Sequence, residues 1–197
     1  MHDLLRAVYQ YPGLNDQEIQ LILNRHKQIE LKKGSFLLQV PEVSTSYYIL
    51  YDGLMRSYVH DAAGNEITTN FFSNSDIVIE VASLFKQQAT QENIQALSNC
   101  ILFEISFQDF QEIFVTIPAF AEWGRMWMTM ALSQQKERML NMITQSAPQR
   151  YLQLLNEKPQ VVQQAPLKYI ASYLGITDTS LSRVRKEITN HPIITDN

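Results

Sequence analysis

Hydroxyl-bearing and basic residues are concentrated in the stretch TDTSLSRVRK, which runs from Thr177 to Lys186. A guanidinium group can donate two hydrogen bonds to guanine, and hydroxyl and ammonium groups can bind phosphates or base edges. Leu181 and Val184 recur among these residues at helical spacing, so one helix face would be buried and the other polar. The pattern predicts a helix that reads DNA. Its candidate contact residues are Thr177, Asp178, Thr179, Ser180, Ser182, Arg183 and Lys186.

A short apolar helix is expected just before this segment. The stretch LKYIASYL has a buried face made of Leu167, Ile170, Ala171 and Leu174. Gly175 can adopt the left-handed conformation that ends a helix, and Ile176 would fill the turn. Thr177 or Asp178 would cap the second helix, although an outward Asp178 could instead accept a hydrogen bond from cytosine N4. Two helices joined in this way predict a helix-turn-helix, whose second helix enters the major groove.

The charge distribution favours such a nucleic-acid reader at the C-terminus. The chain has 197 residues and a net charge of −4. The segment from residue 147 onward contains six Lys and Arg and four Asp and Glu, so its net charge is +2. The preceding residues therefore carry a net charge of −6. A plain helical hairpin with a solvated basic face remains an alternative. In that case the chain would be a ligand-binding or protein-interaction module with a degenerate helix-turn-helix.

The residue pattern predicts no enzyme activity. The four histidines lack zinc-ligand spacing, and no nucleophile elbow, phosphate-binding loop or dinucleotide fingerprint occurs, so no catalytic residue, metal or cofactor is expected. Cys100 is the only cysteine, which excludes an internal disulfide framework. No signal peptide or membrane-spanning run is recognised. These features predict a cytoplasmic protein with no membrane partner.

For most of the N-terminal part, the sequence pattern predicts short strands. A helix with Asn15 or Asp16 as its cap comes first, in EIQLILNRH. Runs rich in β-branched and aromatic residues then alternate with turn signals such as Asp52-Gly53 and Gly64-Asn65. The runs are FLLQV, SYYILYD, LMRSYVH, EITTNFF, DIVIEV and CILFEIS. The expected fold class is α+β, with an antiparallel β-roll of the double-stranded β-helix or jelly-roll type and flanking helices over residues 1–117.

A long helix is predicted over residues 118–145. Pro118 suits its first turn, and Phe120, Trp123, Trp127 and Met130 form one stripe. This stripe either packs on the chain's own β-roll or leaves a second face that pairs with another copy, and the two can hold together. The helix RYLQLLNE and the expected linker KPQVVQQAP follow, so residues 146–197 form the predicted helix-turn-helix domain.

These stretches together resemble the Crp/Fnr superfamily of transcription regulators. The segment from ELKKGSFLLQ to EITTNFF is similar to the β-roll of the cyclic-nucleotide-binding-domain fold, and the long helix resembles the dimerisation helix of the family. IASYLGITDTSLSRVRKEI resembles its recognition unit, in the short form of Bacteroidetes-type members. The resemblance implies DNA contacts by Thr179, Ser180, Arg183 and Lys186, with Arg183 as a base-reading arginine.

The sequence departs from the cyclic-nucleotide pattern of that family in two places. Ile79-Glu80-Val81 stands where a Gly-Glu-Leu-like turn is typical, and Thr90-Gln91-Glu92 replaces an Arg-Ser/Thr-Ala triplet. Without the arginine, a phosphate loses a charge-assisted contact worth about 2–3 kcal/mol. Cyclic AMP is therefore not the expected ligand, and the lone cysteine excludes iron–sulfur sensing. The tentative effector pocket consists of Phe72, Ile79, Glu80, Val81, Phe85 and Gln91; alternatively, its apolar members are core.

The functional prediction is a homodimeric, sequence-specific transcription regulator that binds a palindromic site in double-stranded DNA. A small effector in the β-roll would control it, and RNA polymerase is a candidate partner. The sequence leaves open whether an effector exists, what it is, which operator is bound, and whether the protein activates or represses.

Overall fold

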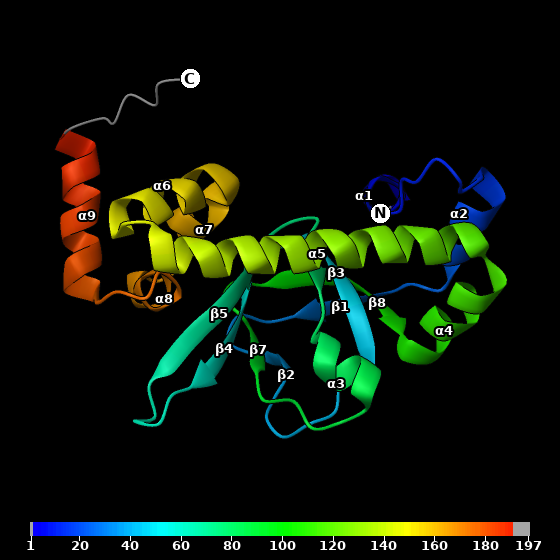
Figure 1. Ribbon diagram of the computed structural model, residues 1–197. Helices are drawn as coiled ribbons and strands as arrows, with labels where there is room; N and C mark the ends of the chain where they lie inside the picture. Colours follow the sequence, from blue (N-terminus) through cyan, green and yellow to red (C-terminus); the bar gives the residue numbers. More distant parts are fainter. Residues whose placement is uncertain (1, 191–197) are drawn as a thin grey trace.

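The structure is a computed structural model that describes residues 2–190, with side chains described for residues 3–188. A β-roll lies below one long helix, and a group of short helices is attached at the far end of that helix (Figure 1). The α+β class and the antiparallel roll predicted from the sequence are confirmed. The long helix links the two ends of the molecule.

Two antiparallel four-stranded sheets form the roll, in the orders β1-β8-β3-β6 and β2-β7-β4-β5. Their strands are β1 (Lys27–Leu31), β2 (Phe36–Leu38), β3 (Ser46–Asp52), β4 (Met55–His60), β5 (Glu66–Phe72), β6 (Ile77–Val78), β7 (Asn93–Ala96) and β8 (Cys100–Ser106). β1 and β7 were not predicted. The order makes β5 an outer strand of its sheet.

The predicted run DIVIEV is only in part a strand. β6 ends at Val78, and α3 (Val81–Lys86) begins three residues later. Glu80 causes the change, because its carboxylate accepts hydrogen bonds from the N–H groups of Ala82 and Ser83 and so caps the helix. The predicted turn at Gly53 is confirmed. There φ is +121°, and a Cβ would lie 2.6 Å from Cys100 Sγ, so the turn requires glycine.

Two short helices precede the roll, α1 (His2–Val8) and α2 (Asp16–Asn24). Asn15 caps α2 and forms a reciprocal capping box with Glu18, as one of the two predicted alternatives requires. Ser106 caps α4 (Phe107–Thr116), because its hydroxyl accepts a hydrogen bond from Asp109 N at 3.0 Å. These helices pack against one face of the roll.

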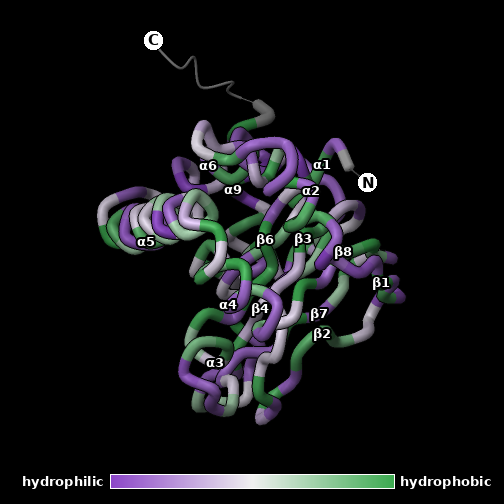
Figure 2. Tube along the Cα trace, turned by 90° about the vertical axis from the view of Figure 1, so that its right-hand side faces the viewer, coloured by the Kyte–Doolittle hydropathy of each residue, from purple (hydrophilic) through white to green (hydrophobic). Residues whose placement is uncertain are grey.

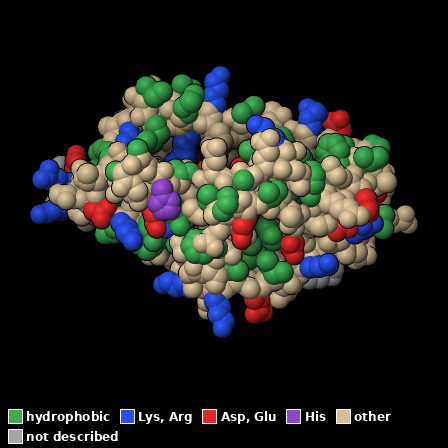
Figure 3. All heavy atoms as spheres, turned by 90° about the horizontal axis from the view of Figure 1, so that it is seen from below, with side chains coloured by type: hydrophobic (Ala, Val, Ile, Leu, Met, Phe, Trp, Pro, Cys, Tyr) green, Lys and Arg blue, Asp and Glu red, His purple; other side chains and the backbone are tan. Residues whose placement is uncertain are grey.

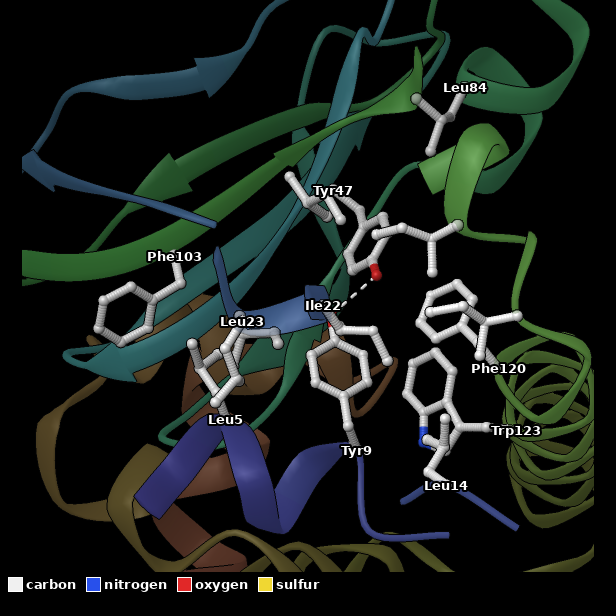
Figure 4. Close-up of a cluster of buried hydrophobic side chains, with 14 residues drawn as sticks. Leu5, Tyr9, Leu14, Ile22, Leu23, Tyr47, Leu84, Phe103, Phe120 and Trp123 are labelled. Carbon is white, nitrogen blue, oxygen red and sulfur yellow. Dashed lines mark hydrogen bonds between the residues drawn. The ribbon is translucent and has the colours of Figure 1, made fainter. Parts of the chain in front are cut away.

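A large hydrophobic cluster joins the N-terminal helices, the roll and the start of the long helix. Figure 4 shows Tyr9, Tyr47, Phe120 and Trp123 pointing toward one another, with a hydrogen bond between the two tyrosine hydroxyls. Tyr9 Oη also lies 2.8 Å from His26 Nε2, and Trp123 Nε1 donates to Val8 O at 3.0 Å. The start of the long helix is therefore fixed firmly to the roll.

The long helix α5 spans Pro118–Thr144, as predicted, and its 27 residues extend about 40 Å. Viewed along its axis in Figure 2, α5 stands to one side of the roll, and hydrophobic and hydrophilic residues alternate around it. Only its first turns are buried, at Phe120, Trp123 and Gly124. The rest of the helix leaves much of its surface uncovered within this chain.

Four short helices complete the described chain: α6 (Ala147–Glu157), α7 (Pro159–Gln164), α8 (Leu167–Tyr173) and α9 (Asp178–Asn190). The stretch KPQVVQQAP was predicted to be a linker, and this was wrong for most of it. Pro159 begins α7, and Val161 is fully buried in a second hydrophobic cluster. Tertiary packing therefore makes a helix of a polar, proline-flanked stretch.

Candidate nucleic-acid interface and effector cleft

α8 and α9 are joined by a turn of the kind that the predicted helix-turn-helix requires. Gly175 adopts φ +66°, and Ile176 N donates to Ala171 O at 3.0 Å, so the turn satisfies the carbonyls at the end of α8. Ala171, Leu181 and Val184 are buried where the helices meet. Their packing turns one face of α9 inward and leaves the opposite face outward.

Thr177 caps the second helix, because its Oγ1 accepts a hydrogen bond from Ser180 N at 3.2 Å. The alternative in which Asp178 is the cap is therefore wrong. Of the predicted DNA contacts, Ser180 is half-buried, and the others are exposed, namely Thr177, Asp178, Thr179, Ser182, Arg183 and Lys186. α9 lies at the outer end of the molecule (Figure 1). The structure thus brings these side chains onto one accessible helix.

α8 also packs against β5 of the roll. Leu54 and Phe71 of the roll belong to the same hydrophobic cluster as the buried residues of α6 to α9. Ser172 Oγ on α8 accepts a hydrogen bond from Thr68 N at 3.2 Å. Lys158 Nζ donates to Phe71 O at 2.7 Å and also pairs with Asp76 at 2.8 Å. Polar side chains from the C-terminal helices therefore complete the outer edge of β5.

Arg138 joins three elements of the structure. It projects from α5, donates to the carbonyl oxygens of Thr69 on β5 and Tyr173 on α8, and stacks on the Tyr173 ring at 4.0 Å. A change in the position of α5 relative to the roll would therefore disturb α8 as well.

A buried arginine lies close to the contact between α8 and the roll. Arg56 on β4 has no exposed surface, and its guanidinium lies 4.1 Å from the Tyr58 ring centroid and 3.4 Å from that of Tyr169 on α8. Its Nη2 pairs with Glu66 at 2.5 Å, whereas its Nε and Nη1 have no hydrogen-bond partner within the described part of the chain. The ion pair with Glu66, a hydrogen bond to Gln95 and stacking between the two rings together stabilise this charge.

A cleft of about 1640 Å³ lies between the roll, α3, α5 and α8. Of the predicted effector-pocket residues, five line it: Phe72, Ile79, Glu80, Val81 and Phe85. Gln91, the sixth, is exposed just before β7 and does not line this cleft, whereas the neighbouring Glu92 does. Seen from below, the surface is hollowed, with hydrophobic side chains exposed around the hollow (Figure 3).

Ser57, Thr69 and Arg138 also line the cleft, and the sequence did not single them out. The alternation of side chains between the two faces of the strand EITTNFF could have placed Thr69 on an inner face of the roll. The contact between Arg138 and Thr69 could not have been predicted, because the two residues are 69 positions apart and no local pattern in the sequence links them. The cleft therefore combines apolar walls with hydroxyl, carboxylate and guanidinium groups.

The residues predicted for dimerisation fall into two groups. Phe120 and Trp123 are 0% and 4% exposed in the chain's own core, so the prediction that they pair with a partner was wrong. Trp127 is partly buried against the same cluster, whereas Met130 is 54% exposed. Further uncovered apolar residues follow on α5, namely Leu132, Met139, Leu140, Met142 and Ile143. The C-terminal two thirds of α5 thus carries the free apolar surface.

None of the described helices is long and apolar enough to cross a membrane. Within residues 2–190, no group of three or more His, Cys, Asp or Glu is arranged to hold a metal ion.

Residues 28–116 match the family model of the cyclic nucleotide-binding domain. No curated protein matches the sequence. Among solved structures, FixK2 of Bradyrhizobium japonicum aligns with a TM-score of 0.72 and 16% identity, covering 87% of this chain and 89% of that one. The c-di-GMP-responsive global regulator CLP of Xanthomonas campestris aligns at 0.69 and 14%, covering 93% and 96%. A Eubacterium rectale protein described as a Crp/Fnr-family transcriptional regulator aligns at 0.67 and 19%, covering 92% and 88%. These likenesses show a common fold.

Proposed function

Because residues 28–116 form a domain of the cyclic nucleotide-binding family within the fold of Crp/Fnr regulators, we propose that this chain is a sequence-specific DNA-binding transcription regulator. The observation that carries the proposal is the outward face of α9. Arg183 and Lys186 lie exposed on it, beside exposed hydroxyls, while Leu181 and Val184 hold the helix to its domain. A recognition helix needs this combination of a fixed inner face and a polar outer face.

The proposed active form is a homodimer that pairs through α5. Leu132 and Ile143 are 73% and 75% exposed, and no other part of the described chain covers them. Their burial by a second copy would be favourable, at about 25 cal/mol per Å² of apolar surface. Two recognition helices then bind half-sites about 34 Å apart, which combines two weak affinities into one strong affinity. A palindromic operator follows from this symmetry.

The cleft between the roll and α5 is the proposed effector site. Arg138 lines the cleft and contacts both Thr69 on β5 and Tyr173 on α8. A ligand that moved this side chain would therefore alter the packing of α8 against β5. A ligand can shift the protein only by its different affinity for the two arrangements. RNA polymerase and a cytoplasmic setting remain predictions.

Selection of random duplex DNA by the purified full-length protein tests the regulator. We expect a palindromic consensus, with binding that weakens steeply as salt concentration rises. Failure to bind any duplex at low salt would overturn the proposal and favour the second candidate, an interaction module with a degenerate helix-turn-helix. The exposed carboxylate of Asp178, which would repel phosphates, is the observation behind that second candidate.

A further inference from the structure

Two hydroxyl groups form a polar floor in the cleft. Ser57 on β4 and Thr69 on β5 have oxygens 2.7 Å apart, and both side chains line the cleft. Ser57 is only 2% exposed. Each hydroxyl has one hydrogen to donate and two lone pairs to accept, so the pair retains free acceptor capacity after bonding to itself.

Glu92 lies beside this floor. It is half-buried just before β7, and no cation of the described chain approaches its carboxylate within salt-bridge distance. Burial raises the pKa of Glu92, and the nearby charge of Glu80 raises it further, while the hydroxyls of Thr69 and Ser57 and the charge of Arg138 lower it. A half-buried carboxylate without a cation is costly, because desolvation disfavours the charged form.

The other charged groups closest to Glu92 are already engaged. Glu80 uses its carboxylate to cap α3. Arg138 donates to the carbonyls of Thr69 and Tyr173 and stacks on the Tyr173 ring, so its guanidinium is held away from a salt bridge with Glu92. Of the two carboxylates that line the cleft, Glu92 is therefore the one that neither caps a helix nor pairs with a cation, and its hydrogen bonds come from the Thr69 and Ser57 hydroxyls.

We propose that the cleft binds a small ligand through a positively charged nitrogen that bears N–H donors, with Glu92 as counter-charge and the Ser57 and Thr69 hydroxyls as acceptors. The proposal rests on the effector role proposed above and names the ligand class. The floor has spare acceptors, which a donor-rich cation satisfies. Phe72, Ile79 and Trp127 supply apolar walls for the remainder of the ligand. Lys86, Arg125 and Arg138 also line the cleft, but an anionic ligand placed on the Ser57 and Thr69 floor would meet the charge of Glu92 there.

Three probes of nearly equal shape separate charge from size: benzamidine, benzamide and benzoate. Isothermal titration of the full-length protein should give benzamidine an affinity at least about tenfold higher than that of benzamide, since only the cation forms a charge-assisted contact with Glu92. Benzoate should bind more weakly than both. Equal affinity for benzamidine and benzamide, or a preference for benzoate, would overturn the proposal.

Variants of Glu92 test whether this residue causes the preference for benzamidine over benzamide. Glu92→Gln should reduce the benzamidine preference to about twofold or less, since it keeps shape and removes charge. Glu92→Asp should retain a preference and thereby shows that the fold tolerates substitution at this position. Glu30→Gln, at an exposed glutamate on β1 outside the cleft lining, is the matched control and should behave as the unmodified protein. A full preference in Glu92→Gln would place the cation elsewhere and refute the proposal.

The two proposals fail separately. Benzamidine binding through Glu92 without any DNA binding would overturn the regulator and support the cation site. A palindromic consensus without a charge preference among the three probes would support the regulator and overturn the ligand class.

Discussion

The hydroxyl oxygens of Ser172 and Thr68 lie 3.0 Å apart across the contact between α8 and β5, and Ser172 Oγ also accepts from Thr68 N. Because Thr68 is 1% exposed, Ser172→Ala would leave a buried N–H without a partner. We expect a loss of about 1–3 kcal/mol in the free energy of unfolding, measured by urea denaturation. Ser133→Ala, at an exposed site on α5, should change it by less than about 0.5 kcal/mol. Equal effects would show that the contact contributes nothing.

The stacking of Tyr169 on Arg56 gives a second prediction. Tyr169→Ala removes the ring centred 3.4 Å from a guanidinium with no exposed surface, so Arg56 keeps only Tyr58 as a stacking partner. We expect the free energy of unfolding to fall by about 2 kcal/mol or more. Tyr169→Phe keeps the ring and should lose less than half as much. If both variants unfold alike in denaturant, the ring does not stabilise Arg56.

Stability should decrease in mild acid because of His26. Its Nδ1 lies 2.9 Å from Ile22 O, a carbonyl that can only accept, so Nδ1 carries the hydrogen. Nε2 of the neutral ring then accepts from the Tyr9 hydroxyl, which in turn accepts from Tyr47. Protonation of His26 at Nε2 would remove this acceptor and so break the hydrogen bond from the Tyr9 hydroxyl. Burial lowers the pKa of His26, despite opposing contributions from the Ile22 carbonyl and Asp109.

The direction of the pH effect follows from linkage. The unfolded chain binds a proton on His26 near the ordinary pKa of about 6.5, and the folded chain binds it only at lower pH. The folded state therefore loses stability as pH falls from about 7 toward 5. Urea unfolding at several pH values measures this slope. His26→Gln should have a shallower slope over that window, and an unchanged slope would assign the effect to other groups.

Arg183 and Lys186 should affect DNA binding differently. Arg183→Ala is expected to cost about 1–3 kcal/mol on the selected operator and to relax preference at one base pair. Lys186→Ala should weaken binding to all sequences similarly and reduce the salt slope by about one. Quantitative shifts on the operator and on scrambled duplex measure both. Both side chains are exposed, so unfolding should be unaffected. A uniform loss for Arg183→Ala would contradict its base-reading role.

The proposed dimer depends on the exposed half of α5. Leu132→Glu or Ile143→Glu would place charge in an apolar interface and should raise the dimer dissociation constant by at least about tenfold. Sedimentation over a concentration series measures this. Gln134→Glu, at an exposed polar position of α5, adds the same charge and serves as the control. A dimer that tolerates both apolar-to-acid changes would exclude pairing through this surface.

Local signals in the sequence predicted much of the fold. Asn15 caps its helix, Gly53 forms its turn and Pro118 starts the long helix, because each depends on near neighbours. The predictions for two stretches were wrong for two different physical reasons, tertiary burial and a local helix cap. Polar KPQVVQQAP becomes helical because Val161 is buried, and DIVIEV turns into a helix where Glu80 caps it.

The residues on the outward face of α9 were predicted correctly, because helical spacing alone places Leu181 on the buried face and Arg183 on the exposed face. The cleft was predicted only in part. Residues near Ile79 were identified from chain order, whereas Arg138 and Thr69 are 69 residues apart and meet only in the folded chain. Phe120 and Trp123 were assigned to the wrong surface, because an apolar stripe does not indicate which neighbour it faces.

The outer strand β5 has its backbone groups bonded by Ser172, Arg138 and Lys158, all from beyond the roll. A truncated chain that ended after β8 would present this strand as a bare template on which other copies could add strands. The long helix and the C-terminal helices are therefore expected to protect the β-roll against aggregation, and a shortened version made for crystallography would need a substitute for them along that edge.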